Sequence, residues 1–297
     1  SGNIKTAVGP FTTNNDITIA TNTTFNAASF THSVYGNWVK IGAFTAGTST
    51  IQFLGPATAS ITGATTFNIL TSNTTNSTTQ LFLNSNVSAA IVNMTKGTIR
   101  TGTNTLTITN TRTGNGDIYG YIQRTHAFTT GVAYAFKNPY NTISFSSVSA
   151  VTSITVFVDD HNISDFPFGG AVNAEYNIAV PAGTYNATLR LGYEDDELNG
   201  NDESTMGLWH YNGSAWNAVG KTANDITNNW VEQSGLTDIT NRWTFSSAAN
   251  AVQWNGSVSI DWNTAANWTV LGGSATAPPS ANDIVNLGTV AFNYQPT

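Results

Sequence analysis

The sequence predicts an all-β protein, and three observations lead to that class. Thr and Asn number 48 and 36 of the 297 residues, while charged residues make up only 9%. Thr, Val, Ile and aromatic residues favour a pleated, half-buried surface, and Asn and Gly favour turns. Apolar residues recur at every second position in short runs, and no window shows the periodicity of a helix.

The composition excludes several other classes of protein. Without cysteine the chain has no disulfide framework and no thiolate site. No run of about 18 apolar residues is present, so we expect no transmembrane helix. Residues 1–130 carry a net charge of +4, residues 131–250 of −9 and residues 251–297 of −2. Because the basic residues are spread out rather than clustered, nucleic acid is not an expected partner.

The alternating runs of residues 15–110 are short and evenly spaced. They cover 16–20, 49–54, 60–61, 67–70, 80–83, 90–94, 97–100 and 105–109. Short strands in regular succession, joined by Gly, Asn and Thr turns, suit a β-solenoid as well as a β-sandwich. Stacked ladders of Thr and Asn favour the solenoid, although no strict repeat length is visible.

The N-terminal third carries motifs that decide between these folds. Residues 35–55 read YGNWVKIGAFTAGTSTIQFLG, residues 61–70 read ITGATTFNIL, and residues 96–108 read KGTIRTGTNTLTI. This stretch resembles a repeated unit of large secreted surface proteins of the Bacteroidota and their relatives. The resemblance implies a right-handed parallel β-helix over residues 1–130.

The resemblance continues through the rest of the chain. Residues 120–139 resemble the junction of these proteins, although Lys137-Asn138 stands before Pro139 where a bare Phe-Pro is commoner. Residues 174–178, 187–209 and 213–220 resemble a β-sandwich module, which implies a sandwich over residues 131–250. Residues 254–268 and 278–287 resemble an element that opens a new β-helix, so residues 251–297 are expected to open or complete another solenoid.

The middle segment is expected to have one compact core. Alternation in Ala187-Thr-Leu-Arg-Leu and in Met206-Gly-Leu-Trp sets which side chains face inward. The predicted core residues are Tyr176, Leu189, Leu191, Leu208 and Trp216.

One acidic stretch is a candidate metal site. Residues 194–203 hold six carboxylates with Asn and Gly between them, and Ca²⁺ prefers six to eight oxygen ligands. The candidate Ca²⁺ ligands are Glu194, Asp195, Asp196, Glu197, Asp202 and Glu203. The alternative is a solvated acidic turn between two strands. Asp159-Asp160-His161 is a second, weaker acidic turn.

No catalytic constellation is evident, so we expect a protein that is not an enzyme. The four histidines are scattered, and no G-x-S-x-G elbow occurs. Glycoside hydrolysis needs two opposed carboxylates, whereas residues 1–130 contain only Asp16 and Asp117.

Trp254, Trp262 and Trp268 lie within fifteen residues of one another and could stack on the apolar faces of sugars. The alternative is that these rings pack a β core. Asn-x-Ser/Thr sequons are frequent, as expected by chance in a chain rich in Asn and Thr.

The function predicted from these features is that of a non-enzymatic structural protein at the cell surface or outside the cell. Its copies would assemble head to tail into a filament or layer, the C-terminal strands of one copy pairing with the solenoid of the next. The side chains expected to set the register are Ile284, Val285, Leu287, Val290 and Phe292. The alternative is a surface adhesin or carbohydrate-binding module with glycans as partners.

Overall fold

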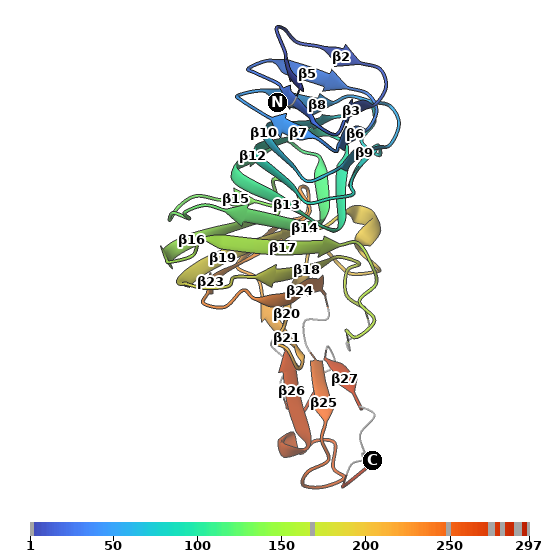
Figure 1. The fold of residues 1–297 in the computed structure, drawn as a ribbon. Coiled ribbons are helices and arrows are strands. Elements are labelled where there is room, and N and C mark those ends of the chain that lie inside the picture. Colours follow the sequence, from blue (N-terminus) through green and yellow to red (C-terminus); the bar gives the residue numbers. More distant parts are fainter. Residues whose placement is uncertain are drawn as a thin grey trace. The chain divides into compact units, whose positions relative to one another are not determined.

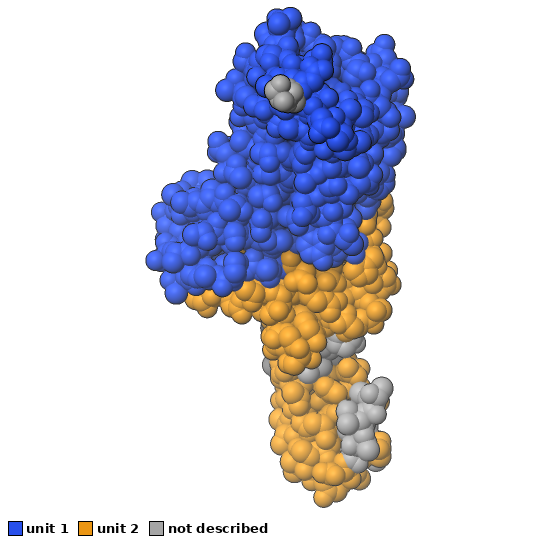
Figure 2. Space-filling view, viewed as in Figure 1, with its two compact units in different colours: residues 1–159, 178–187 blue, residues 160–177, 188–297 orange. Residues whose placement is uncertain are grey.

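The computed structural model describes residues 3–166, 170–247, 251–272, 277–279, 283–287 and 293–295. The chain divides into unit 1, residues 1–159 and 178–187, and unit 2, residues 160–177 and 188–297 (Figure 2). The division runs through β18 (Glu175–Ala179) and β19 (Thr184–Gly192). Residues 131–159 therefore group with the N-terminal strands, whereas the sequence predicted a boundary after residue 130.

The predicted all-β class is confirmed, and a β-solenoid of about six turns forms most of unit 1 (Figure 1). In the described part of the chain the helical segments are two short 3₁₀ turns, η1 (Asp195–Glu197) and η2 (Ala265–Asn267). No helix among the described residues is long and apolar enough to span a membrane.

The solenoid strands pair in parallel along three faces. One face has the order β1-β4-β7, a second runs β2-β5-β8-β10-β12-β13-β14, and the third runs β3-β6-β9-β11-β13 and on to β14. The strands are β1 (Asn3–Thr6), β2 (Thr12–Thr13), β3 (Ile17–Ile19), β4 (Thr23–Asn26), β5 (Thr31–Val34), β6 (Trp38–Lys40), β7 (Ala43–Thr45), β8 (Thr50–Phe53), β9 (Ala59–Thr62), β10 (Thr65–Asn73), β11 (Gln80–Leu83), β12 (Val87–Lys96), β13 (Thr98–Thr113) and β14 (Asp117–Thr125).

The register shows why the sequence has no strict repeat. Residues 31, 50, 69, 91 and 111 are successive partners on the second face, so the coils are 19, 19, 22 and 20 residues long. Two of these pairings also contain a register shift, between Ser72 and Asn73 and between Ala89 and Ile91. Insertions of this kind leave the stack of strands intact, but they move each motif out of phase with the one before it.

Alternating residues fill the solenoid interior as the sequence predicts. Ile51, Leu70 and Val92 are successive inward partners, and all three are fully buried. Arg112 continues this column and donates hydrogen bonds to the backbone carbonyls of Gly114, Gly116 and Lys137. A buried cation is tolerated here because these carbonyls replace water around its guanidinium group. Burial lowers the pKa of Arg112 to about 10.

Parallel stacking in unit 1 ends at β14. The next strand along the sheet, β17 (Ser153–Asp159), pairs with β14 in the antiparallel sense. Beside it, β15 (Tyr134–Ala135) and β16 (Thr142–Ser149) form an antiparallel pair that belongs to another sheet. The face of unit 1 that carries β11, β13, β14 and β17 is therefore a continuous sheet of mixed direction.

Unit 2 contains strands of two sheets that contact each other through their side chains. The strands follow the order β18-β24-β20-β21 within one sheet and β19-β23-β22 within the other. The Tyr176 hydroxyl on β18 donates to the Gly192 carbonyl on β19, and the ring of Tyr193 lies 5.5 Å from that of Phe245 on β24. The added strands are β20 (Gly207–Tyr211), β21 (Trp216–Gly220), β22 (Ala223–Asp225), β23 (Trp230–Leu236) and β24 (Asn241–Ser246).

The predicted core residues of this segment are all buried, but they do not form a single core. Tyr176, Leu189, Leu191 and Leu208 are fully buried. Trp216 is also buried, yet it packs in a different cluster with Ile163, Phe166, Ala171 and Trp209. Ile163, Phe166 and Ala171 of that cluster lie in the loop before β18. The alternation within strands could not predict their burial, because loop side chains follow no period.

The C-terminal strands form a small sheet of their own within unit 2. β25 (Ala251–Trp254) lies between β26 (Trp268–Gly272), which is antiparallel to it, and β27 (Ile284–Asn286), which is parallel to it. The parallel pairing of β25 and β27 agrees with strands that open another solenoid.

Candidate functional site

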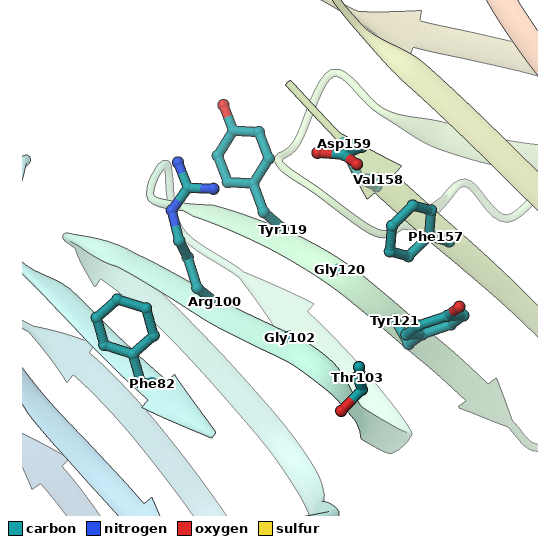
Figure 3. A pocket seen from close by; sticks show the side chains of 10 residues that line it. All are labelled: Phe82, Arg100, Gly102, Thr103, Tyr119, Gly120, Tyr121, Phe157, Val158 and Asp159. Carbon is teal, nitrogen blue, oxygen red and sulfur yellow. The ribbon is translucent and has the colours of Figure 1, made fainter. Parts of the chain in front are cut away.

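An open groove of about 410 Å³ lies on the outer face of unit 1, where β11, β13, β14 and β17 run side by side (Figure 3). Strand register brings its residues together, because Phe82 on β11 pairs with Arg100 on β13, which pairs with Tyr119 on β14. Its lining residues are Phe82, Arg100, Gly102, Thr103, Tyr119, Gly120, Tyr121, Phe157, Val158 and Asp159.

The floor of the groove is bare at Gly102, which stands in the outward phase of β13 without a side chain. The register of β13 against β14 shifts between Arg100 and Thr105, so Gly102 stands in a bulge with a φ of 58°. Opposite the bulge, Gly120 has a φ of 92°, and a Cβ atom there would lie 2.1 Å from the Thr101 hydroxyl oxygen. Only glycine fits at position 120, which lies in the inward phase of β14, and the two strands approach each other closely beneath the floor. Bulges of this type commonly re-aim side chains beside functional sites.

Aromatic rings form the two sides of the groove. Tyr121 and Phe157 are cross-strand partners whose ring centroids lie 4.6 Å apart. Phe82 stands on the opposite side, with Gly102 and Gly120 between it and that pair (Figure 3). Phe82 and Tyr121 are 37% and 38% exposed, so both rings reach solvent on the outer face of the sheet. The groove therefore presents apolar ring surface to solvent at two separate places.

Polar groups lie between and beside these rings. The guanidinium carbon of Arg100 lies 4.6 Å from the centroid of the Tyr119 ring, and the ammonium nitrogen of Lys137 lies 4.8 Å from the same centroid. Attraction between a cation and the face of a ring fixes the position of Tyr119. Thr103 and Asp159 complete the lining with a hydroxyl and a carboxylate. The groove thus offers donors and acceptors close to exposed rings.

Sequence reasoning did not single out these rings, although their positions carried a signal. Leu81 and Leu83 point into the core, so Phe82 between them occupies the outward phase of its strand. Tyr119 and Tyr121 alternate in the same way with buried Ile118 and Ile122. Large aromatic residues in the outward phase of three of these four strands, β11, β14 and β17, are the pattern that marks the groove.

Four of the six candidate Ca²⁺ ligands accept hydrogen bonds from different partners. Glu197 accepts a hydrogen bond from the Glu194 backbone N–H at 2.8 Å, within the first turn of η1. Asp195 accepts from the Asn229 amide, and Asp202 accepts from the Ser204 backbone N–H at 2.9 Å.

Glu203 accepts from the Tyr193 hydroxyl at 3.0 Å, while Asp196 is exposed. The hydrogen bonds from Ser204 lower the pKa of Asp202, whereas burial raises the pKa of Tyr193. Among the residues the structure describes, no group of three or more His, Asp or Glu side chains is arranged to hold a metal ion. Ca²⁺ binding at residues 194–203 stays a prediction.

The tryptophans proposed to stack on sugars pack mainly against one another. Trp254 and Trp268 are buried in a cluster with Val252, and their ring centroids are 4.9 Å apart in an edge-on arrangement. Trp262 is partly buried, 4.6 Å from Trp268. Two of the three rings thus have no face open to a sugar, which agrees with the alternative that they pack a β core.

The residues expected to set register between copies are only partly described. Ile284 and Val285 lie in β27, where Val285 packs against the tryptophan cluster of the same unit. Leu287 follows the strand and is exposed. Val290 and Phe292 lie outside the described residues.

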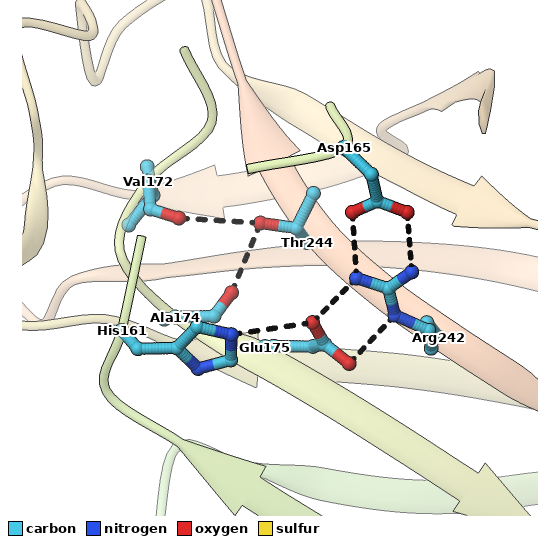
Figure 4. A network of polar contacts seen from close by, with 7 residues as sticks. All are labelled: His161, Asp165, Val172, Ala174, Glu175, Arg242 and Thr244. Atoms are coloured by element: carbon cyan, nitrogen blue, oxygen red, sulfur yellow. Dashed lines mark hydrogen bonds and ion pairs between the residues drawn. The ribbon is translucent and has the colours of Figure 1, made fainter. Parts of the chain in front are cut away.

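A polar network in unit 2 was also missed at the sequence level (Figure 4). The guanidinium group of Arg242 donates to both carboxylate oxygens of Glu175, at 2.7 and 2.8 Å, and to both of Asp165, at 2.6 and 2.9 Å. It also lies 5.0 Å from the ring centroid of Trp216. His161, part of the second acidic turn, lies 3.9 Å from Glu175.

These contacts shift the ionisation of the network and define its role. The hydrogen bonds from Arg242 hold the pKa of Asp165 below its usual value, and both carboxylates raise the pKa of Arg242. Two bidentate pairs on one guanidinium leave it little capacity for a further ligand. We therefore interpret the network as a structural clasp between β24, β18 and the loop that carries Asp165.

Comparison of the chain with protein-family models, curated proteins and solved structures finds no significant match. The resemblance to surface proteins of the Bacteroidota stays a prediction, and function is argued below from the geometry of the groove.

Proposed function

We propose that this chain is a carbohydrate-binding module and that the groove on unit 1 is its binding site. The observation that carries the proposal is the pair of exposed aromatic walls, Phe82 on one side and Tyr121 with Phe157 on the other, over a floor of glycine backbone. A sugar ring has apolar C–H faces and a rim of hydroxyl groups. Aromatic faces cover the former, while Arg100, Thr103 and Asp159 supply hydrogen-bonding partners for the latter.

The charge of the groove favours a sugar over a nucleic acid, which also stacks on aromatic rings. Its lining includes one basic residue, Arg100, and one acidic residue, Asp159, and the buried ammonium group of Lys137 beside Tyr119 adds one positive charge. Single-stranded nucleic acid needs a row of cations beside its stacking platforms to follow the phosphates. A groove with so few charged groups and a polar rim suits an uncharged glycan better. We also propose that the protein acts outside the cell or on its surface, and that it binds glycan without cleaving it.

A screen of purified protein against immobilised soluble glycans tests this proposal. Tyr121→Ala removes one wall, and we expect it to weaken binding about tenfold, the equivalent of about 1.4 kcal/mol. Tyr35→Ala is the matched control, because Tyr35 is 36% exposed in the same unit but does not line the groove. Glycan binding that Tyr121→Ala leaves unchanged, or an absence of any glycan binding, contradicts the proposal.

Head-to-tail assembly is a second candidate function, supported by one observation. Among the described residues, β27 pairs with β25 alone and forms an edge of the C-terminal sheet, and Leu287 beside it is 45% exposed. An open strand edge is a template for pairing with another chain. The assay is analytical ultracentrifugation of wild type and Leu287→Lys, with Val258→Lys as control because Val258 is exposed outside the strands of this sheet. Assembly predicts polymers that only Leu287→Lys reduces, whereas a wild-type monomer at every concentration contradicts it.

A further inference from the structure

We infer that the groove takes an oligosaccharide of β-1,4-linked, gluco-configured sugars lying across the strands, rather than a single sugar ring. This inference rests on the proposed function, and it names the class of glycan and its direction. The observation behind it is that the two aromatic walls are too far apart for one ring.

Strand register gives the separation of the walls. Phe82 and Tyr119 are separated by two strand spacings, because Arg100 on β13 pairs with both. Tyr121 lies two residues further along β14. With strands about 4.8 Å apart and a rise of about 3.3 Å per residue, the Cα atoms of Phe82 and Tyr121 are roughly 12 Å apart. A pyranose ring is narrower than that distance, so a ligand that touches both walls contains more than one ring.

The middle of the groove suits a sugar between the two that stack. Gly102 has no side chain in the outward phase of β13, and a Cβ built there would meet no atom within 4 Å, so a ring can approach the backbone closely at this point. Arg100 and Thr103 stand beside this floor (Figure 3), and we expect their hydrogen-bond donors to reach the hydroxyl groups of a central sugar. The expected path of the glycan runs from Phe82, past Arg100, to the pair formed by Tyr121 and Phe157.

The aromatic walls also select the configuration of the sugar. A ring whose substituents are all equatorial carries only C–H groups on its two faces, so both faces are apolar. β-1,4 linkage between such rings is equatorial as well, which keeps the chain extended and ribbon-like. Galacto-configured sugars and α-1,4-linked chains place a hydroxyl group or the linkage axially, and so fit two separated walls less well.

Two contacts joined by one ligand make affinity depend on chain length. When the first wall holds one sugar, the second wall binds another at a high effective concentration. We expect affinity to rise at least tenfold between glucose and the shortest cello-oligosaccharide that spans both walls, and to stay level for longer chains.

The experiment is isothermal titration calorimetry of wild type, Phe82→Ala, Tyr121→Ala and Tyr35→Ala with glucose, cellobiose, cellotriose, cellotetraose and cellohexaose. We expect Phe82→Ala to abolish the gain with length while short ligands still bind at Tyr121, and Tyr35→Ala to match wild type. Phe82→Thr, with a strand-favouring residue, replaces Phe82→Ala if circular dichroism shows that variant to be unfolded.

The possible outcomes separate this inference from the proposed function. Equal affinity of wild type for all chain lengths overturns the inference, as does an unchanged length dependence in both Phe82 variants. Binding of other glycan classes in the screen, with no cello-oligosaccharide bound, overturns the inference and leaves the proposed function standing. Failure of every glycan in the screen to bind overturns both.

Discussion

Replacing Arg242 by Met tests the structural clasp of unit 2, and the geometry sets the expected cost. The two carboxylates differ in exposure: the side chain of Glu175 is 8% exposed, whereas that of Asp165 is 48% exposed. An exposed ion pair contributes about 0–1 kcal/mol, but removal of the partner from a buried charge costs about 3–5 kcal/mol. Because Arg242 is itself partly exposed, we expect Arg242→Met to lower the free energy of unfolding by about 2–4 kcal/mol at pH 7.

Urea denaturation followed by tryptophan fluorescence measures this cost, and Asp165→Asn is the matched control. The control removes only the exposed pair, so its expected cost is at most about 1 kcal/mol. A cost for Arg242→Met below about 0.5 kcal/mol, or an equal cost for Asp165→Asn, would refute this explanation of the clasp.

The pH dependence of the cost follows from the pKa of Asp165, which Arg242 lowers in the folded protein. A carboxylate with a depressed folded-state pKa contributes stability above its unfolded pKa, about 3.9, and loses it as the pH falls through the folded value. The stability difference between wild type and Arg242→Met should therefore shrink below about pH 4. A difference that grows as the pH falls would contradict this sign.

Three further predictions concern packing, the groove floor and the acidic turn. Leu191→Ala should lower the free energy of unfolding by about 2–5 kcal/mol in urea denaturation, since Leu191 is fully buried; a cost below about 0.5 kcal/mol would place it on the surface. Gly120→Ala should cost about 1–3 kcal/mol in the same assay, because its φ of 92° and the nearby Thr101 hydroxyl leave no room for a methyl group; wild-type stability would contradict this. Ca²⁺ binding within Glu194–Glu203 predicts a higher melting midpoint with Ca²⁺ than with chelator, and equal midpoints would contradict it.

The alternation of apolar and polar residues was enough to predict the strands and the faces that they turn inward. Leu189 and Leu191 are buried as the alternation requires, and Ile51 and Phe53 fill the solenoid in the same way. A period of two identifies the face of each strand without knowledge of its neighbours. The coil length escaped detection because insertions, such as the register shift at Ser72, change it from one turn to the next.

The groove and the clasp depend on contacts between distant residues, which pattern alone does not supply. Phe82 and Tyr121 meet the same groove only because β11, β13 and β14 align in one register. Arg242 and Glu175 pair across 67 residues of sequence. The close spacing of Trp254, Trp262 and Trp268 in the sequence suggested a sugar-binding surface. In the structure these three rings pack against one another in a common core. The outward-phase rings of Phe82, Tyr121 and Phe157, which lie on separate strands, were the better indication of a binding site.

A crystal structure of the protein with the tightest-binding oligosaccharide from the screen tests carbohydrate binding at the groove most directly. We expect sugar rings stacked on Phe82 and on Tyr121 with Phe157, and hydroxyl groups of a central sugar hydrogen-bonded to Arg100 or Thr103. Electron density for the glycan elsewhere, for example against Trp262, with an empty groove would contradict the assignment of this site.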